Sequence, residues 1–242
     1  MTKYGVITLP AFAGEGDGVW HFFGTRHRPG DAGVLGKAGA SVRCVVSVRQ
    51  VHGTDALVVT RPLRPRELSG GGWDALITSR SGILLTVTTA DCVPILIHDP
   101  VRHVVAAVHA GWRGAVAGIV PATLAKMHRE FGSEPAALHV GVGPSVGPCC
   151  YEVDEPVLNP LRAGLPDWRS VVRGTERGKA ALDLRALVRR QAESAGVAEE
   201  RIRTVSVCTG CHPDLFYSYR REGRVNGSMV SGIMLTGRSP KR

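Results

Sequence analysis

The sequence predicts a single mixed α/β (α+β) domain in which mixed β-sheets are flanked by a few helices. Short runs rich in Val, Ile and Thr, separated by Gly and Pro, recur through the first 145 residues and are typical of strands. Only two segments have a convincing helical spacing of apolar residues. The chain has 242 residues, 43% of them hydrophobic, which is enough to bury one large core. We find no internal repeat and no interdomain linker, so residues 1–242 are predicted to form one domain.

Each β-rich run is assigned to a strand and each apolar stripe to a helix. In chain order, the predicted strands span residues 42–48, 56–60, 75–78, 83–88, 93–98, 104–108, 138–142, 202–208 and 229–235. One helix is predicted over residues 115–131, with Pro121 near a kink or a restart. The second helix is predicted over residues 180–195, where Leu184 and Leu187 belong to an apolar stripe. Irregular polar segments, which we expect to be loops, span residues 28–39, 61–72 and 162–178.

Charge and hydropathy limit the partners of the chain. A formal net charge of +9 suits a polyanionic partner. The basic residues are mostly single arginines, often beside Asp or Glu, and there is no helix-turn-helix or RNA-binding signature. No apolar run is long enough to span a bilayer, and the first ten residues lack the apolar stretch of a signal peptide. We therefore expect a cytoplasmic monomer or weak homodimer that acts on a small molecule and binds neither nucleic acid nor membrane.

Cysteine usage is compatible with metal or thiol chemistry. In a cytosolic chain, cysteines are more often free, metal-bound or catalytic than paired in disulfides. The motif CTGCH at residues 208–212 matches the attachment pattern of a c-type haem, but no export signal accompanies it and it follows a predicted core strand. We reject the haem interpretation; a chance match and a minor second metal or redox site stay open. The six cysteines are Cys44, Cys92, Cys149, Cys150, Cys208 and Cys211.

Three candidate ligands, His52, Cys92 and His109, each lie where a β-rich run gives way to a turn. If these runs share a sheet and an edge, the three side chains can converge there. Two imidazoles and one thiolate suit zinc, and three protein ligands leave a fourth position for water or substrate. The long spacings give no motif-level support, and each residue alone also fits a hydrogen-bonded histidine or a buried apolar cysteine. A second hypothesis makes Cys92 a nucleophile with His52 or His109 as its base.

Five motifs occur in order: QVHGTD (50–55), TADCVPIL (89–96), HAGWRG (109–114), GPSVGPCCYEV (143–153) and FYSYRREG (216–223). Together they closely resemble the bacterial laccase-domain family, also called multicopper polyphenol oxidase-like or peptidoglycan editing factor proteins. The resemblance extends from about Phe22 to near the C-terminus. It implies one α/β domain related to the deamidating toxins that use a Cys–His pair, and zinc ligands at His52, Cys92 and His109.

The same resemblance implies purine nucleoside chemistry, namely phosphorolysis of adenosine, inosine and methylthioadenosine together with adenosine deamination. Other members are described as polyphenol oxidases or as enzymes that remove wrongly incorporated amino acids from peptidoglycan precursors. The chain departs from the family pattern at two places. Residues 23–30, FGTRHRPG, keep Arg26 but are shortened and lack the Leu-Asn pair of the family; residues 225–228, VNGS, replace its Thr-Gly-Arg. These changes bear on the substrate range more than on the metal.

Further residues are assigned roles around the predicted metal. Arg26 and Arg113 are predicted to steer anionic groups, and Arg113 can hold a phosphate or carboxylate bidentately, with a surface ion pair as its alternative. Asp91 is predicted to orient a ligand or carry a proton, with a turn or capping role as the alternative. Tyr217 and Arg220 are predicted to bind substrate, because the family places their segment near the pocket; a strand face is the alternative.

The leading hypothesis is a zinc enzyme that acts on a nucleoside and phosphate. Catalytic roles are predicted for His52, Cys92, His109, Arg26, Arg113 and Asp91. The alternatives are an amidase that edits cell-wall precursors, a polyphenol oxidase, and a non-catalytic protein with structural zinc. Copper is less favoured than zinc, because three ligands cannot hold a cluster of several copper ions.

Overall fold

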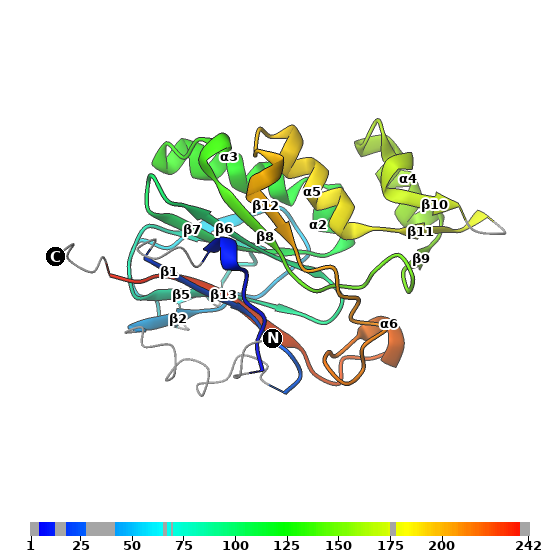
Figure 1. Cartoon of the computed structure of the whole chain (residues 1–242), viewed down its shortest axis with the longest axis horizontal. Helices are drawn as coiled ribbons and strands as arrows, with labels where there is room; N and C mark the ends of the chain where they lie inside the picture. The colour runs from blue at the N-terminus through cyan, green and yellow to red at the C-terminus, as the bar shows by residue number, and fades with distance from the viewer. Residues whose placement is uncertain are drawn as a thin grey trace.

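Two β-sheets lie face to face, and helices cover the outer face of the larger one (Figure 1). The computed structural model describes residues 5–12, 18–27, 42–64, 67–68, 70–174 and 178–237. Within these ranges the larger sheet has six strands in the order β12-β8-β6-β7-β4-β3. Their bounds are β3 (Ala56–Val58), β4 (Ala75–Thr78), β6 (Val93–Asp99), β7 (Val104–Ala110), β8 (His139–Val142) and β12 (Ile202–Thr204). The sheet is mixed: β6 runs antiparallel to both β7 and β8, whereas β3–β4 and β12–β8 are parallel pairs.

The second sheet has four described strands in the order β1-β13-β5-β2. They are β1 (Val19–Phe23), β2 (Cys44–Val46), β5 (Ile83–Thr89) and β13 (Met229–Leu235). A small third sheet lies at one end of the molecule and contains β9 (Glu152–Val153), β10 (Val172–Gly174) and β11 (Ala180–Leu182). The α-helices are α2 (Trp112–Val116), α3 (Ile119–Phe131), α4 (Glu155–Gly164), α5 (Leu184–Ser194) and α6 (Tyr219–Glu222). Short 3-10 helices span Pro10–Phe12, Pro135–Ala137, Trp168–Val171 and Glu199–Arg201.

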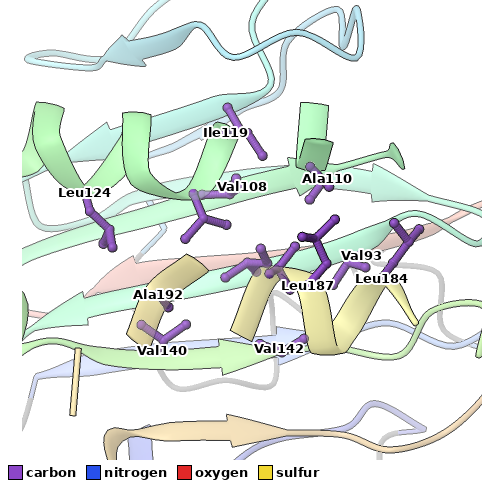
Figure 2. Packing of buried hydrophobic residues seen from close by; sticks show 14 of the residues in the cluster. Val93, Val108, Ala110, Ile119, Leu124, Val140, Val142, Leu184, Leu187 and Ala192 are labelled. Carbon is purple, nitrogen blue, oxygen red and sulfur yellow. The ribbon is translucent and has the colours of Figure 1, made fainter. Parts of the chain in front are cut away.

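Alternate side chains of the central strands pack into two different cores, because successive residues of a strand point to opposite faces. Val93 and Val108 pack under the helices, as do Val140 and Val142; Figure 2 shows them facing Leu124 of α3 and Leu187 of α5. Residues of the other parity fill the space between the two sheets, among them Leu96, Val105 and Ala107. Burial of each such aliphatic side chain contributes about 1.5–3 kcal/mol to the free energy of folding. The central strands are therefore apolar on both faces, which explains their continuous hydrophobic runs.

Strands β6 and β7 form a hairpin whose open end carries the residues of interest below. The hairpin turn is closed by the Asp99 carboxylate, which accepts the backbone N–H groups of Val101 and Arg102 at 2.9 Å each. At the other end Val93 pairs with Ala110, and Pro94 pairs with His109. Cys92, which directly precedes β6, is thereby brought beside the last residues of β7.

The structure confirms the predicted mixed α/β architecture and corrects several boundaries. The helix predicted over 115–131 is two helices, because Gly118 (φ +88°) ends the first and Pro121 lies in the first turn of α3. The helix predicted over 180–195 begins only at Leu184. Residues 180–182 are strand β11 instead, and the Asp183 carboxylate caps α5 by accepting the N–H groups of Arg185 and Ala186.

Other differences concern the length of two predicted strands, the content of a predicted loop and one strand that was not predicted. The strands predicted over 42–48 and 202–208 are shorter, at Cys44–Val46 and Ile202–Thr204. The predicted loop 162–178 contains the end of α4, a 3-10 helix and β10, and β1 was not predicted at all. The predicted loop 28–39 lies outside the described residues. Across the described part of the chain, no helix combines the length and the apolar character that crossing a membrane requires.

Candidate metal centre and cavity

Strand pairing brings His109, Asp74 and Cys92 to one edge of the larger sheet. In the antiparallel β4–β7 pair Ala75 lies opposite Val108, so Asp74 is the neighbour of His109. The two side chains share the face that packs toward the second sheet, because they have the parity of Leu76 and Ala107. Cys92 reaches the same edge from the connection between β5 and β6. The predicted convergence of His52, Cys92 and His109 is therefore found, but the prediction of one shared sheet edge is wrong. The strands before His52 and Cys92, β2 and β5, pair in the smaller sheet, whereas β7 lies in the larger one.

The carboxylate of Asp74 is fully buried and organises this edge. Its Oδ1 lies 2.7 Å from Nδ1 of His109, which is also buried. The same carboxylate accepts the backbone N–H groups of Val51 (3.2 Å), His52 (3.0 Å) and Gly53 (2.7 Å). These bonds position the turn that carries His52. Asp74 thus orients the His109 ring and holds the backbone of His52.

His52, Cys92 and His109 form a compact cluster whose donor atoms all lie within 4.8 Å of one another. Nε2 of His52 is 3.9 Å from Sγ of Cys92, and the rings of His52 and His109 meet edge to face with centroids 4.8 Å apart. His52 has a φ of +60° and Asp91, beside Cys92, a φ of +100°. Such left-handed backbone in residues other than glycine costs free energy and is concentrated at functional sites.

Gly111 explains why small residues follow His109. A Cβ atom at this position would lie 2.5 Å from Cδ2 of His52 and 3.2 Å from Sγ of Cys92. At Gly114 a Cβ would lie 2.7 Å from the backbone oxygen of Gly53. The start of α2 therefore packs directly against the His52 turn, and only glycine allows this approach.

Electrostatics at the cluster favour a thiolate beside a charged imidazole. Burial opposes ionisation of the Cys92 thiol, but hydrogen bonds and charge from His109 and His52 outweigh it and lower the pKa of Cys92 to about 7. Burial likewise disfavours the charged form of His109, yet Asp74 and Cys92 raise the pKa of His109 to about 9. For Asp74, burial is outweighed by His109 and the Gly53 N–H, so the pKa of Asp74 is lowered.

The cluster lies in the wall of a cavity of about 850 Å³, within the range of small-molecule sites. Trp112 and Arg113 line it from the start of α2, and Tyr219 and Arg220 from α6. The remaining lining residues include Gln50, Thr88, Thr89, Tyr151, Val225 and Ser228. Positively charged and aromatic side chains therefore line the same cavity as the cluster.

Among the predicted residues, Arg113, Arg220 and Asp91 also line the cavity. The Arg113 guanidinium lies over the Trp112 ring at 4.3 Å, and that of Arg220 over the Tyr151 ring at 5.0 Å. Both Asp91 carboxylate oxygens are occupied, since Oδ1 accepts the Thr209 hydroxyl (2.5 Å) and Oδ2 accepts the Arg220 N–H (2.6 Å). Asp91 thus ties two loops together, which matches the capping alternative.

Arg26 and Tyr217 are not among the residues that line the cavity. Arg26 donates to the backbone oxygen of Pro213, and its guanidinium stacks 4.8 Å from the Tyr217 ring. The two side chains therefore contact each other beside the cavity, and the structure does not bring them to the cluster. The strand-face alternative for Tyr217 and Arg220 is wrong, because Arg220 lies on α6 and Tyr217 lies in the loop before it.

Asp74 and Tyr151 belong to the site but were not predicted from the sequence. Asp74 stands directly before the apolar run of β4, and a polar residue beside such a run is the same signal that identified Cys92. Tyr151 belongs to a recognised motif, but no periodicity points to its position in the cavity wall. Burial, with the charge of Cys92 adding, raises the pKa of Tyr151 to about 12.

The donor set fits a metal ion. Because Asp74 occupies Nδ1 of His109, Nε2 is left for coordination, as in the carboxylate–histidine–metal arrangement of many metalloproteins. Two imidazoles and a thiolate of lowered pKa are typical zinc ligands. A metal ion would replace the proton in the hydrogen bonds that join Cys92 to His109 and His52.

Comparisons with known proteins agree on one family. The sequence model described as multi-copper polyphenol oxidoreductase laccase matches residues 32–236. A purine nucleoside phosphorylase of Bacteroides thetaiotaomicron is 38% identical over 192 residues, which is 77% of this chain and 71% of that protein. Adenosine deaminase RL5, from an unknown prokaryotic organism, is 35% identical over 81% of this chain and 76% of its own length. The crystal structure of YlmD from Geobacillus stearothermophilus matches with a TM-score of 0.81 and 30% identity over 95% of this chain and 94% of that one.

Proposed function

This chain belongs to the multi-copper polyphenol oxidoreductase laccase family, and we propose that it acts as a zinc-dependent enzyme of purine nucleosides. The proposed reactions are phosphorolysis of adenosine, inosine and methylthioadenosine, and deamination of adenosine. Relatives named purine nucleoside phosphorylase and adenosine deaminase support this class of substrate. The observation that carries the proposal is the cluster of His52, Cys92 and His109, which Asp74 positions in the wall of the 850 Å³ cavity.

Zinc is the proposed ion, whatever metal the family description names. Among the described residues that line the cavity, the three cluster members are the only histidines and cysteines. That donor set suits one zinc ion with an open position and cannot hold several copper ions. When bound, zinc would supply Lewis-acid activation of a water molecule or a substrate oxygen near neutral pH. A polyphenol oxidase would need copper ligands that this cavity wall lacks.

In this proposal the side chains around the cluster bind and orient the substrates. Asp74 keeps His109 in the tautomer that leaves Nε2 free, and it also holds the His52 turn. Arg113 and Arg220 provide the positive charge that phosphate requires, and a guanidinium can bind phosphate oxygens bidentately. Phosphorolysis breaks the bond between sugar and base and joins the sugar carbon to a phosphate oxygen. Deamination replaces the exocyclic amino group with oxygen from water and releases ammonia.

One observation favours a second candidate, an amidase that edits peptidoglycan precursors. Cys92, His109 and Asp74 have the composition of a nucleophile, its base and the group that orients the base. The pKa of Cys92, lowered to about 7 by the histidines against the effect of burial, makes thiolate available at neutral pH. In that reaction the thiolate would attack an amide carbonyl, and the His109 imidazolium would protonate the leaving amine, which leaves a thioester on Cys92. Water, deprotonated by His109, would then hydrolyse the thioester, release the carboxylic acid and restore the thiolate.

One experiment separates the two candidates. The purified protein, with its zinc content quantified, is incubated with adenosine and phosphate, and separately with a muramoyl nucleotide that carries a wrongly incorporated serine. Nucleoside chemistry predicts adenine with ribose 1-phosphate, and inosine from deamination, and predicts that chelator removes both activities. Absence of free base and of inosine with fully zinc-loaded protein would rule out the proposed function, and serine release would favour the amidase.

A further inference from the structure

A second group of potential ligands lies beside the cavity and is not used by the proposed function. Its members are Cys149, Cys150, Cys208 and Cys211, whose sulfur atoms all lie within 4.8 Å of one another. Sγ of Cys211 is 3.4 Å from Sγ of Cys149 and 3.4 Å from Sγ of Cys150. We propose that these four cysteines bind one structural zinc ion, separate from the His52–Cys92–His109 cluster.

Sulfur spacing favours a shared metal ion over a disulfide. A disulfide requires about 2.05 Å between two sulfur atoms, whereas ligands at 2.3 Å from a tetrahedral zinc are about 3.8 Å apart. The four cysteines are free, and two of them contact Cys211 at the same distance, so no single pair is selected. Tetrahedral coordination by four sulfurs is typical of structural zinc.

Two loops that are distant in sequence supply the ligands. Cys149 and Cys150 lie in a turn after β8, and Cys208 and Cys211 in a segment after β12. A β-bridge between Ser145 and Cys208 aligns the loops, and the Gly147 N–H donates to Sγ of Cys208 at 3.2 Å. Such N–H donors to sulfur are a usual feature around thiolate ligands of metals.

Glycine at position 210 allows the loops to close on one another. A Cβ atom at Gly210 would lie 3.0 Å from both Cβ and Sγ of Cys150, and 3.6 Å from Sγ of Cys208. At Gly147 a Cβ would lie 3.3 Å from Cβ of Cys208. The backbone of each loop therefore packs directly against a cysteine side chain of the other, as a shared ion would require.

Charge around the cluster suits four thiolates. Coordination removes four thiol protons, so Zn²⁺ with four Cys ligands carries a net charge of −2. The guanidinium of Arg185 donates to the backbone oxygen of Val207 (3.0 Å), and that of Arg221 to the backbone oxygen of Thr209 (2.8 Å). Both cations are thus anchored to the chain segment that holds Cys208. Arg221 also forms an ion pair with Glu222 (2.7 Å), so Arg185 is the cation that offsets the negative charge.

The proposed ion would stabilise one wall of the cavity. Thr209 lies between the cysteines of the second loop, and its hydroxyl donates to Oδ1 of Asp91 at 2.5 Å. Asp91 in turn accepts the N–H of Arg220, which lines the cavity. The four-cysteine cluster is therefore connected by two hydrogen bonds to the loop that precedes Cys92 and to α6.

Zinc content of the full chain tests the proposal. Wild type and the variants Cys211→Ser, Cys92→Ser and Cys44→Ser are purified with a thiol reductant and without chelator, and zinc per folded chain is measured by mass spectrometry. We expect two zinc ions in wild type, one in Cys211→Ser, one in Cys92→Ser, and two in Cys44→Ser, whose thiol lies outside both clusters. Equal zinc content in wild type and Cys211→Ser would overturn the inference.

A second measurement remains decisive if Cys211→Ser does not fold. In Cys92→Ser the zinc bound to the four-cysteine cluster is examined alone by X-ray absorption at the zinc edge, with four sulfur neighbours at about 2.3 Å as the expected result. Nitrogen or oxygen neighbours, iron in place of zinc, or a disulfide among the four cysteines of the reduced protein would each overturn it. This outcome is independent of the nucleoside assays, so the two proposals fail separately.

Discussion

The carboxylate of Asp74 lies 2.7 Å from Nδ1 of His109 and also accepts the backbone N–H of His52 at 3.0 Å. One buried side chain therefore orients the imidazole of one candidate ligand and the backbone of another. The third candidate, Cys92, comes from a different connection and approaches His52 to 3.9 Å. The geometry of the candidate metal centre consequently depends on a residue that is not one of its three candidate ligands.

Replacement of Asp74 by asparagine is expected to weaken zinc binding about 10- to 100-fold, the usual effect of losing such a partner. The amide cannot accept all the N–H groups that the carboxylate accepts, so His109 and the His52 turn lose their orientation. Competition with a chromophoric chelator measures the affinity. Asp55→Asn, in the same segment but exposed, is the control and should bind zinc like wild type. Unchanged affinity in Asp74→Asn would contradict the role assigned to Asp74.

Gly111→Ala is expected to abolish zinc binding at the His52–Cys92–His109 cluster and to leave the fold intact. The added methyl group would lie 2.5 Å from the His52 ring, which must therefore move away from Cys92. Zinc content and circular dichroism check the two halves of this expectation. At Gly174 a Cβ meets nothing within 4 Å, so Gly174→Ala is the matched control. Full zinc retention in Gly111→Ala would contradict this expectation and show that the His52 ring can still coordinate zinc beside the added methyl group.

Arg113→Lys is expected to raise the KM for phosphate about tenfold, equivalent to about 1.4 kcal/mol. Lysine keeps the charge but loses the planar pair of donors that binds phosphate bidentately. Initial rates of phosphorolysis at varied phosphate concentration measure the effect. Arg129→Lys, in an exposed ion pair with Glu130 on α3, serves as the control. An unchanged KM for phosphate would remove Arg113 from the proposed binding site.

His21 should make the protein less stable as the pH falls from 6.5 toward 4. Its Nε2 accepts the Leu9 N–H at 2.8 Å, and burial, with the charge of His98 adding, lowers the pKa of His21 from 6.5 to about 4. Between pH 6.5 and pH 4 the imidazole of His21 binds a proton in the unfolded chain but not in the native protein. Protonation of the unfolded chain therefore lowers the free energy of unfolding as the pH falls below 6.5, whereas above pH 6.5 His21 has no such effect. The expected loss between pH 7 and pH 5 is about 2 kcal/mol.

The contribution of His21 is measured by urea unfolding of wild type and His21→Gln at pH 7 and at pH 5. It is the difference between the two proteins in the free energy of unfolding that each loses between these pH values. Glutamine can still accept a hydrogen bond but does not titrate, so the pH dependence common to both proteins cancels. If wild type and His21→Gln lose equal free energy of unfolding between pH 7 and pH 5, His21 does not stay neutral in the native state.

Thr209→Val should weaken the connection between the four-cysteine cluster and the cavity. Valine has the shape of threonine but leaves Oδ1 of the mostly buried Asp91 without its donor, which costs about 1–3 kcal/mol. We expect a lower free energy of unfolding and a higher KM for adenosine. Thr204→Val is the control, because the Thr204 hydroxyl is buried with no hydrogen-bond partner among the described residues. Equal effects of the two substitutions would mean that the Thr209–Asp91 bond has no special importance.

The cluster residues could be selected from sequence because each is a reactive side chain at the end of an apolar run. Strands β4, β5, β6 and β7 were predicted within two residues at either end, since buried strands have continuous β-branched and aliphatic sequence. The convergence of His52, Cys92 and His109 could be proposed only on the assumption that their runs share an edge. That assumption held for the runs before His52 and Cys92, because β2 and β5 pair in one sheet, and it was wrong for the run before His109, because β7 belongs to the other sheet.

Tertiary pairing explains what could not be predicted. Residues 180–182 have helical neighbours but become a strand, because β9 and β10 pair with them on both sides. Arg26 was assigned to the cavity, but it stacks on Tyr217 beside it. The four-cysteine cluster shows the same difficulty, since Cys149 and Cys208 meet only when β8 and β12 pair.

The origin of the ligands in separate segments has a consequence for folding. Cys92 and His109 are brought together by a local hairpin, a contact of modest loop-closure cost that can form early. His52 joins them only when β4, which directly follows Asp74, has docked on β7. A nascent chain would thus present a two-donor site of low metal affinity first, and the complete site only near the end of folding. The presence of metal should therefore lower the unfolding rate much more than it raises the refolding rate, when the two rates are measured separately.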